Sequence, residues 1–317
     1  MPLRDPTGLL GLLADGTCAL SAAWTAQKER GGRLALHTIL WIALHLGRPA
    51  ARALLYPITL YFLAKARPQR IASQRFLTRV LGRPAGLSQV ARHIHCFAST
   101  ILDRVYLLAG HQSRLDVALH GDELVRARLA SGQGFLLLGA HLGSFEILRA
   151  LAVEQENIPL KILMYPDHNE IITSLLDALN PRIADTVIPL GRPNTLLAVD
   201  EALRAGQAVG LLGDRWSPGE STVPCRFLDG VAQFPTGPMA LAATTGVPVI
   251  LFFGLCRGGK RYDIYFEPFA ERIAAVGHAR GALAEWVQRY ATTLERYTRS
   301  APYNWFNFYD FWDDARS

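Results

Sequence analysis

Two patterns of apolar residues divide the chain near residue 110. Residues 34–110 show apolar positions at helical spacing, with breaks at Gly47-Arg48-Pro49 and Gly82-Arg83-Pro84. From about residue 115, short apolar runs alternate with stretches of helical period. We therefore expect an N-terminal helical, membrane-associated region over residues 1–110 and an α/β catalytic domain over residues 111–317.

The second part of the chain predicts a mixed, mostly parallel sheet with helices on both faces. Such a sheet follows when buried strands alternate with helices along the chain. The expected strands are residues 135–140, 160–165, 186–190, 208–213, 247–255 and 262–266, with an irregular hairpin at 221–234. The expected helices are residues 146–155, 171–179, 195–205, 239–245 and 282–299.

Two apolar stretches near the N-terminus are each too interrupted to span a bilayer, which takes roughly 20 apolar residues. Leu34 to Leu46 contains two histidines, and Ala50 to Ala64 contains an arginine and a proline. Helices lying in the membrane interface fit this pattern, and Trp41, Tyr56 and Tyr61 supply the aromatic anchors that interfaces favour. Two ordinary core helices are the alternative.

Charge is concentrated in the same region. Residues 28–104 hold thirteen Lys or Arg and two acidic residues, a local net charge of +11 in a chain whose net charge is +6. This excess suits the anionic lipids of a membrane surface, and an acidic protein partner would also match it. Nucleic acid ranks last, because the charges are interleaved with long apolar helical stretches.

Cysteine usage indicates reduced thiols in a cytosolic compartment and no metal site. The four cysteines are scattered without zinc-ligand spacing, and the N-terminus has no convincing secretory signal. His93, His95 and Cys96 lack a second ligand pair and fit helix-face or core positions. The segment 254–260 nearly spells a phosphate-binding loop, but a strand follows it, so a hairpin turn is expected.

The motif with the clearest chemistry is Gly139-Ala140-His141-Leu142-Gly143-Ser144-Phe145-Glu146. It follows a buried strand, and open α/β sheets place ligand crevices at the carboxyl ends of their strands. Across a strand–turn–helix corner, Glu146 would accept a hydrogen bond from one ring nitrogen of His141. The other ring nitrogen would then act as a general base, and Gly143 would let substrate approach closely.

The alternative is a loop histidine beside a helix-capping glutamate, with no catalytic role. The flanking glycines, the preceding strand and the following helix favour a catalytic role. His141 and Glu146 match the HX4(D/E) block of the glycerolipid, or lysophospholipid, acyltransferase superfamily. The chain most resembles the bacterial lipid A-type (HtrB-like) acyltransferase branch. That resemblance implies an inner-membrane enzyme facing the cytosol, which uses acyl carrier protein or CoA thioesters without a metal or a covalent intermediate.

Three further blocks agree with this resemblance. Residues 210–215 resemble a strand that ends in polar residues beside the active site, residues 226–230 with 234–238 resemble a block that binds the acceptor or a phosphate, and residues 246–249 resemble the final Val-Pro strand. Arginine in such blocks suits the recognition of an anion. The resulting substrate-binding candidates are Gly143, Asp214, Arg215, Arg226, Phe227, Thr236 and Gly237.

Two departures affect the expected acceptor. Thr236 stands where glycerol-phosphate acyltransferases usually carry glutamate after Phe-Pro, and Tyr165 to Asn169 lacks their arginine block. The resemblance therefore points to the lipid A-like branch, or to relatives that acylate a polyene, a glycolipid or another lipid.

We expect an O-acyltransferase without a cofactor, whose partners are membrane lipids and an acyl-ACP or acyl-CoA thioester rather than nucleic acid. We expect a monomer at the cytoplasmic face of a bacterial inner membrane, held peripherally or monotopically. Two other hypotheses remain open. The first is a non-catalytic lipid-binding or carrier-docking protein, which would keep the same basic, apolar N-terminal third. The second is a thioesterase or lipid hydrolase, which would use His141 and Glu146 to activate water instead of an acceptor hydroxyl.

Overall fold

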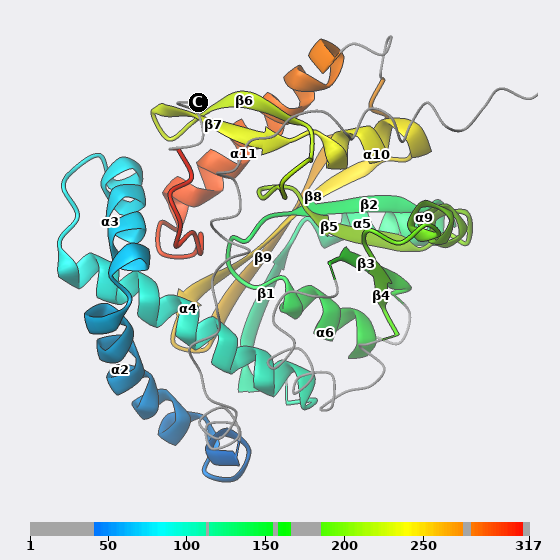
Figure 1. Cartoon of the computed structure of the whole chain (residues 1–317). Helices are drawn as coiled ribbons and strands as arrows, with labels where there is room; N and C mark the ends of the chain where they lie inside the picture. Colours follow the sequence, from blue (N-terminus) through cyan, green and yellow to red (C-terminus); the bar gives the residue numbers. More distant parts are fainter. Residues whose placement is uncertain (1–40, 112–113, 155–157, 166–184, 275–279, 313–317) are drawn as a thin grey trace, which may run out of the picture.

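The computed structural model describes residues 41–111, 114–154, 158–165, 185–274 and 280–312 (Figure 1). The predicted helix at residues 171–179 and most of the apolar stretch from Leu34 to Leu46 lie outside these residues. The described part folds as an α/β layer structure preceded by three helices, as the sequence pattern predicts.

A seven-stranded sheet forms the centre of the described chain. Neighbouring strands pair in parallel, except for β8 and β9, which form an antiparallel hairpin. The order across the sheet is β1 (Asp116–His120), β9 (Arg261–Ala270), β8 (Val249–Gly258), β2 (Phe135–Gly139), β5 (Ala208–Leu212), β3 (Leu160–Met164) and β4 (Val187–Pro189). Strand β1 was missed from the sequence, because alternating exposure makes its apolar run weak.

Helices cover both faces of the sheet, and β2 is buried on both sides as a consequence. Because strand side chains alternate between faces, Leu136 and Leu138 pack in one core and Phe135 and Leu137 in the other. The first core includes α9 (Thr195–Arg204), α10 (Gly237–Thr245) and α11 (Arg280–Ser300). The second includes α4 (Leu87–Leu108), α5 (Asp122–Ala130) and α6 (Glu146–Glu154).

The N-terminal region consists of α2 (Gly47–Lys65), α3 (Arg67–Leu81) and α4, which lie along one side of the sheet domain (Figure 1). Helix α2 continues through Pro57, and Pro68 lies in the first turn of α3, where a helix leaves backbone N–H groups without intrahelical partners, so its missing N–H costs nothing. No helix among the described residues is both long enough and apolar enough to cross a membrane.

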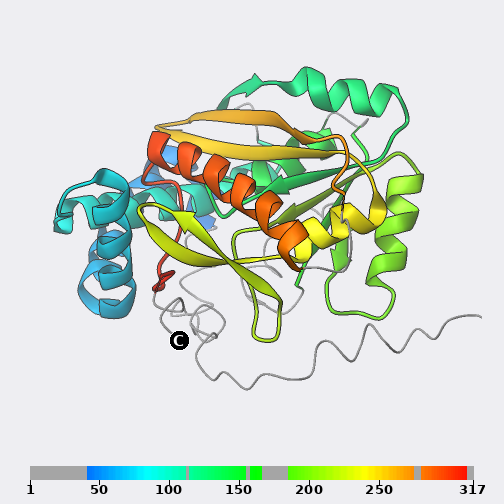
Figure 2. The same ribbon diagram turned by 90° about the horizontal axis from the view of Figure 1, so that it is seen from above.

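A two-stranded hairpin, β6 (Thr222–Phe227) and β7 (Gly230–Pro235), packs beside α11 (Figure 2). The aromatic C-terminal segment, residues 303–312, follows α11 and returns between α3 and the hairpin (Figure 1). Its Trp305, Phe311 and Trp312 are buried against Phe227 of β6. The segment therefore closes the domain by packing.

Candidate active site

His141 meets Asp214 at the carboxyl end of the central strands. Strands β2 and β5 are parallel neighbours in which Gly139 pairs with Leu212, so His141 and Asp214 each lie two residues beyond the same rung. Nδ1 of His141 lies 2.9 Å from Oδ1 of Asp214, and the backbone N–H of His141 donates to both carboxylate oxygens at 3.1 Å. Strand register alone thus brings together two residues that are 73 positions apart.

The position of this pair is a switch point in the sheet. After β2 the chain proceeds to β3 on one side, whereas after β5 it proceeds to β8 on the other. Where successive connections leave in opposite directions, the loops diverge and a crevice opens above the strand ends. His141 is about one third exposed and Asp214 is buried, so the imidazole is the member of the pair that a substrate can reach.

The C-terminal segment forms hydrogen bonds with Asp214 and with the loop that carries His141. The indole Nε1 of Trp305 donates to Oδ2 of Asp214 at 3.0 Å, so both carboxylate oxygens have donors. The N–H of Phe306 donates to the carbonyl of His141 at 3.0 Å, and the N–H of Gly143 donates to the carbonyl of Asn304 at 2.7 Å. Sequence reasoning missed this role, although the dense run of aromatic and asparagine residues near the C-terminus was a usable signal.

Gly143 is required by packing against β8. Its φ of +76° favours glycine, and a Cβ atom there would lie 1.9 Å from the carbonyl oxygen of Gly254. That oxygen also accepts the N–H of Ser144 at 2.7 Å. The glycine therefore lets the loop after β2 lie directly against β8. Contact between Gly143 and substrate stays a prediction.

Glu146 was expected to accept a hydrogen bond from one ring nitrogen of His141, but Asp214 is the carboxylate that lies against the ring, at Nδ1. Glu146 begins α6, as predicted, but its carboxylate lies 3.1 Å from Arg149 and 3.7 Å from Arg104. The physical reason is the strand register, which presents Asp214 directly to the imidazole, while two guanidinium groups hold Glu146. A catalytic role for Glu146 stays a prediction, now with these arginines as its immediate partners.

The charges around the pair define its protonation. Burial alone would raise the pKa of Asp214, but the charge and hydrogen bond of His141, the charge of Arg215 and the indole of Trp305 lower it to about 2. Burial, followed by the charge of Arg215, lowers the pKa of His141 below its ordinary value. At neutral pH, Asp214 is therefore an anion that accepts the Nδ1 proton of a neutral imidazole, leaving Nε2 as the basic nitrogen.

A strand-end histidine held by a buried carboxylate, with its side chain about one third exposed, is equipped to remove a proton from a hydroxyl. The family comparison names the chemistry. A family model described as bacterial lipid A biosynthesis acyltransferase matches residues 29–313. The chain belongs to this family. The sequence resemblance is thereby confirmed, and the protein is a lipid acyltransferase; the search of curated proteins gave no match.

Arg215 of the acyltransferase is fixed beside the His141–Asp214 pair by the C-terminal segment. One of its Nη atoms donates to the carbonyl of Phe306 at 2.8 Å, and its guanidinium lies 5.8 Å from the ring centre of Tyr309. Its charge reaches both members of the pair, since it lowers the pKa of His141 and of Asp214. The sequence singled out this arginine, and the structure places it at the site.

The other candidates from the accessory blocks lie on the β6–β7 hairpin and at the start of α10. Phe227 is buried among the aromatic residues, and Arg226 is exposed, with its backbone held by Gln288. Thr236 is buried and donates to the carbonyl of Ser221 at 3.1 Å, while Gly237 begins α10. The described contacts of these four residues include neither His141 nor Asp214, so their part in substrate binding stays a prediction.

Within the described residues, no group of three or more His, Cys, Asp or Glu side chains is placed to hold a metal ion. His93, which the sequence assigned to a helix face or the core, is fully buried in α4 of the acyltransferase. Its Nδ1 lies 2.8 Å from the hydroxyl of Ser73, and its Nε2 lies 2.9 Å from the carbonyl of Trp305.

The segment 254–260, which nearly spells a phosphate-binding loop, is a hairpin instead. The turn at Gly258 and Gly259 joins β8 to β9, as predicted.

Proposed function

We propose that the enzyme transfers a fatty acyl group from an acyl-ACP or acyl-CoA thioester to a hydroxyl of a lipid or glycolipid. The observation that carries this proposal is the His141–Asp214 pair at the end of β2 and β5, in a chain of the lipid A acyltransferase family. The buried anion orients the ring, and the exposed side of the imidazole faces the acceptor.

The proposed reaction needs one proton shuttle. Nε2 of His141 removes the proton from the acceptor hydroxyl, and the oxygen forms a bond to the thioester carbonyl. The tetrahedral oxyanion then collapses, the carbon–sulfur bond breaks, and the leaving thiolate takes the proton from the imidazolium. Asp214 stabilises that imidazolium, while the positive charge of Arg215 favours the oxyanion. An ester and a free thiol are the products.

We place the enzyme at the cytoplasmic face of a bacterial inner membrane, where acyl-ACP and acyl-CoA meet the lipid acceptor. Members of this family are typically membrane-associated. A lipid A precursor is the acceptor class that the family name favours, and a polyene or another non-phospholipid acceptor remains the second candidate because Thr236 replaces the glutamate of glycerol-phosphate acyltransferases.

His141→Ala tests this proposal. Purified wild-type and variant enzymes are supplied with acyl-ACP or acyl-CoA and an extract of bacterial lipids, and the products are followed by mass spectrometry. Wild type should add one acyl chain to a lipid, and the variant should lose at least about 10³-fold of that rate, because the general base is gone. Circular dichroism should show an unchanged fold.

Three outcomes contradict the proposal. Acyl transfer by His141→Ala at the wild-type rate would remove the histidine from the chemistry. Release of free fatty acid without an acylated lipid would identify a thioesterase. Lipid binding by wild type without turnover of either donor would identify a binding protein.

A further inference from the structure

Helix α2 exposes a continuous apolar face. A helix that faces water normally carries polar residues on that side. Between residues 46 and 64, however, every exposed position is apolar or aromatic, and Tyr56, Leu60 and Tyr61 are 69%, 66% and 49% exposed. We call these residues the α2 stripe: Leu46, Pro49, Ala53, Tyr56, Pro57, Leu60, Tyr61 and Ala64.

The opposite side of α2 is already occupied by protein. Ala51 and Leu55 are buried in a core with Leu102 and Tyr106 of α4. The Tyr106 hydroxyl also donates to the carbonyl of Ala43 at 2.9 Å. The helix is thus apolar on two faces, and only one of them is covered by the described chain.

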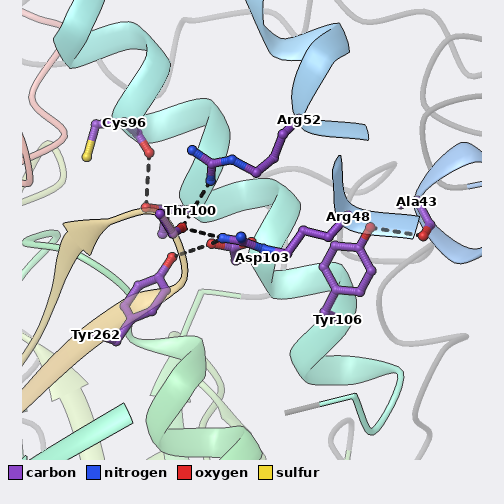
Figure 3. Close-up of polar contacts among 9 residues, drawn as sticks. Ala43, Arg48, Arg52, Cys96, Thr100, Asp103, Tyr106 and Tyr262 are labelled. Atoms are coloured by element: carbon purple, nitrogen blue, oxygen red, sulfur yellow. Dashed lines mark hydrogen bonds and ion pairs between the residues drawn. The ribbon is translucent and has the colours of Figure 1, made fainter. Parts of the chain in front are cut away.

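A polar network, centred on the buried Asp103, fixes α2 to the catalytic domain (Figure 3). The guanidinium of Arg48 donates to both oxygens of Asp103 at 2.8 and 2.9 Å, and the hydroxyl of Tyr262 donates to the same carboxylate at 2.9 Å. Arg52 donates to the carbonyl of Gly259 in the β8–β9 turn at 3.2 Å. Asp103 is buried and paired, so the network sets the direction in which the stripe points.

The charge of the surrounding helices is complementary to an anionic surface. Residues 47–108 carry ten Lys or Arg and a single acidic residue, Asp103. Asp103 is buried against Arg48, so it adds no negative charge to the surface. Lys65 and Arg67 are exposed at the end of the stripe, where α2 passes into α3. An apolar face with a basic edge is the pattern of a helix that lies in the interface of an anionic bilayer.

We propose that the α2 stripe is a membrane-docking surface. Tyr56, Leu60 and Tyr61 insert among the lipid headgroups with α2 parallel to the bilayer, and Lys65 and Arg67 contact lipid phosphates. The rigid attachment of α2 then gives the catalytic domain one orientation toward the lipids. The purpose of this surface rests on the proposed function, because the enzyme has to reach a lipid acceptor in the bilayer. Binding of the protein to vesicles, however, is measured without catalysis.

Vesicle binding by full-length variants tests the proposal. Leu60→Glu with Tyr61→Glu places two negative charges on the stripe, and Leu196→Glu with Leu197→Glu makes a matched change at two exposed leucines of α9. Partition is measured by sedimentation with vesicles of phosphatidylcholine and phosphatidylglycerol, and of phosphatidylcholine alone. The stripe variant should lose about tenfold or more in partition to the anionic vesicles, whereas the α9 variant should stay within about twofold of wild type.

Thermal unfolding of each variant and acyl transfer in detergent micelles separate docking from folding and from catalysis. Both variants should keep the wild-type rate in micelles, so a loss of vesicle binding is not a loss of the proposed function. Ala53→Glu with Ala64→Glu provides a second stripe variant that removes no large side chain, and it should weaken binding in the same direction.

Several results would overturn the proposal. Wild type that fails to bind anionic vesicles, or stripe variants that bind as well as wild type, would show that α2 is not the docking surface. A stripe variant that keeps vesicle binding but changes from dimer to monomer would assign the stripe to a second copy of the chain. A stripe variant that keeps vesicle binding but no longer binds an acidic carrier protein would assign the stripe to that protein.

Discussion

At the scale of single residues, the proposed chemistry depends on one imidazole and the carboxylate that orients it. The carboxylate of Asp214 accepts hydrogen bonds from three donors, the backbone N–H and the ring of His141 and the indole of Trp305. Glu146, five residues after His141, instead balances the charges of Arg149 and Arg104. The two acids are therefore expected to respond differently to substitution.

Asp214→Asn should lower kcat by about 10³-fold or more, because an amide in that place no longer selects the imidazole tautomer with a free Nε2. Glu146→Gln should lower kcat less, since Nδ1 of His141 keeps its acceptor. Acyl transfer under saturating substrates measures both effects, with circular dichroism as the check on folding. A near-normal kcat for Asp214→Asn beside an inactive Glu146→Gln would return the orienting role to Glu146.

At the scale of elements, the C-terminal segment is hydrogen-bonded to the loop that carries His141. Asn304 accepts the N–H of Gly143 through its carbonyl, and its side-chain amide forms hydrogen bonds with the backbone of Cys256 at 2.7 and 3.1 Å. Trp305 adds a hydrogen bond to Asp214. The end of the chain thus connects β8 to the loop after β2, so a change in this segment should reach the chemistry.

Trp305→Phe should lower kcat by about tenfold, because a charge-assisted hydrogen bond to a buried carboxylate contributes about 1.5–3 kcal/mol. Trp312→Phe is the matched control, since its indole donates to the carbonyl of Phe227 at 3.1 Å rather than to Asp214. Kinetics with urea unfolding separate activity from stability. Equal losses of kcat in the two variants would reduce the effect to packing.

At the scale of the whole molecule, the helical region and the sheet domain share one buried core. Phe76 and Leu77 of α3 and Val90 of α4 pack in the same cluster as strand residues and the C-terminal aromatic side chains. His93 adds a polar tie, since its ring bridges Ser73 of α3 and the carbonyl of Trp305. Burial lowers the pKa of His93 to about 4, which makes the stability of this junction depend on pH.

The sign of this dependence follows from the two pKa values. The unfolded chain protonates His93 near its ordinary pKa of 6.5, and the folded chain does so only near 4. Between these values the unfolded state binds more protons, so stability falls as pH falls, by up to about 3 kcal/mol for this group. Urea unfolding across pH 4–7 should show this slope in wild type and a smaller one in His93→Gln. Identical slopes would contradict the assignment.

The sequence by itself determined the fold class and the position of His141 in it. Alternating apolar runs predicted the mostly parallel sheet, and a fully apolar run before Gly139 placed His141 at a strand end, because a strand buried on both faces needs such a run. The same approach missed β1, whose apolar run is weak because its exposure alternates. It also assigned Glu146 as the partner of His141, because motif spacing describes only nearby residues.

Only the tertiary structure decided which groups surround His141. Asp214 lies 73 positions away and is brought to the ring by the register of β2 and β5, and Trp305 lies 91 positions from Asp214. Neither contact is encoded in a local pattern, because strand order and the return of the C-terminal segment depend on how both cores pack. The attachment of α2 through Arg48 and Asp103 follows the same rule, with the charges visible in the sequence and their pairing settled by the fold.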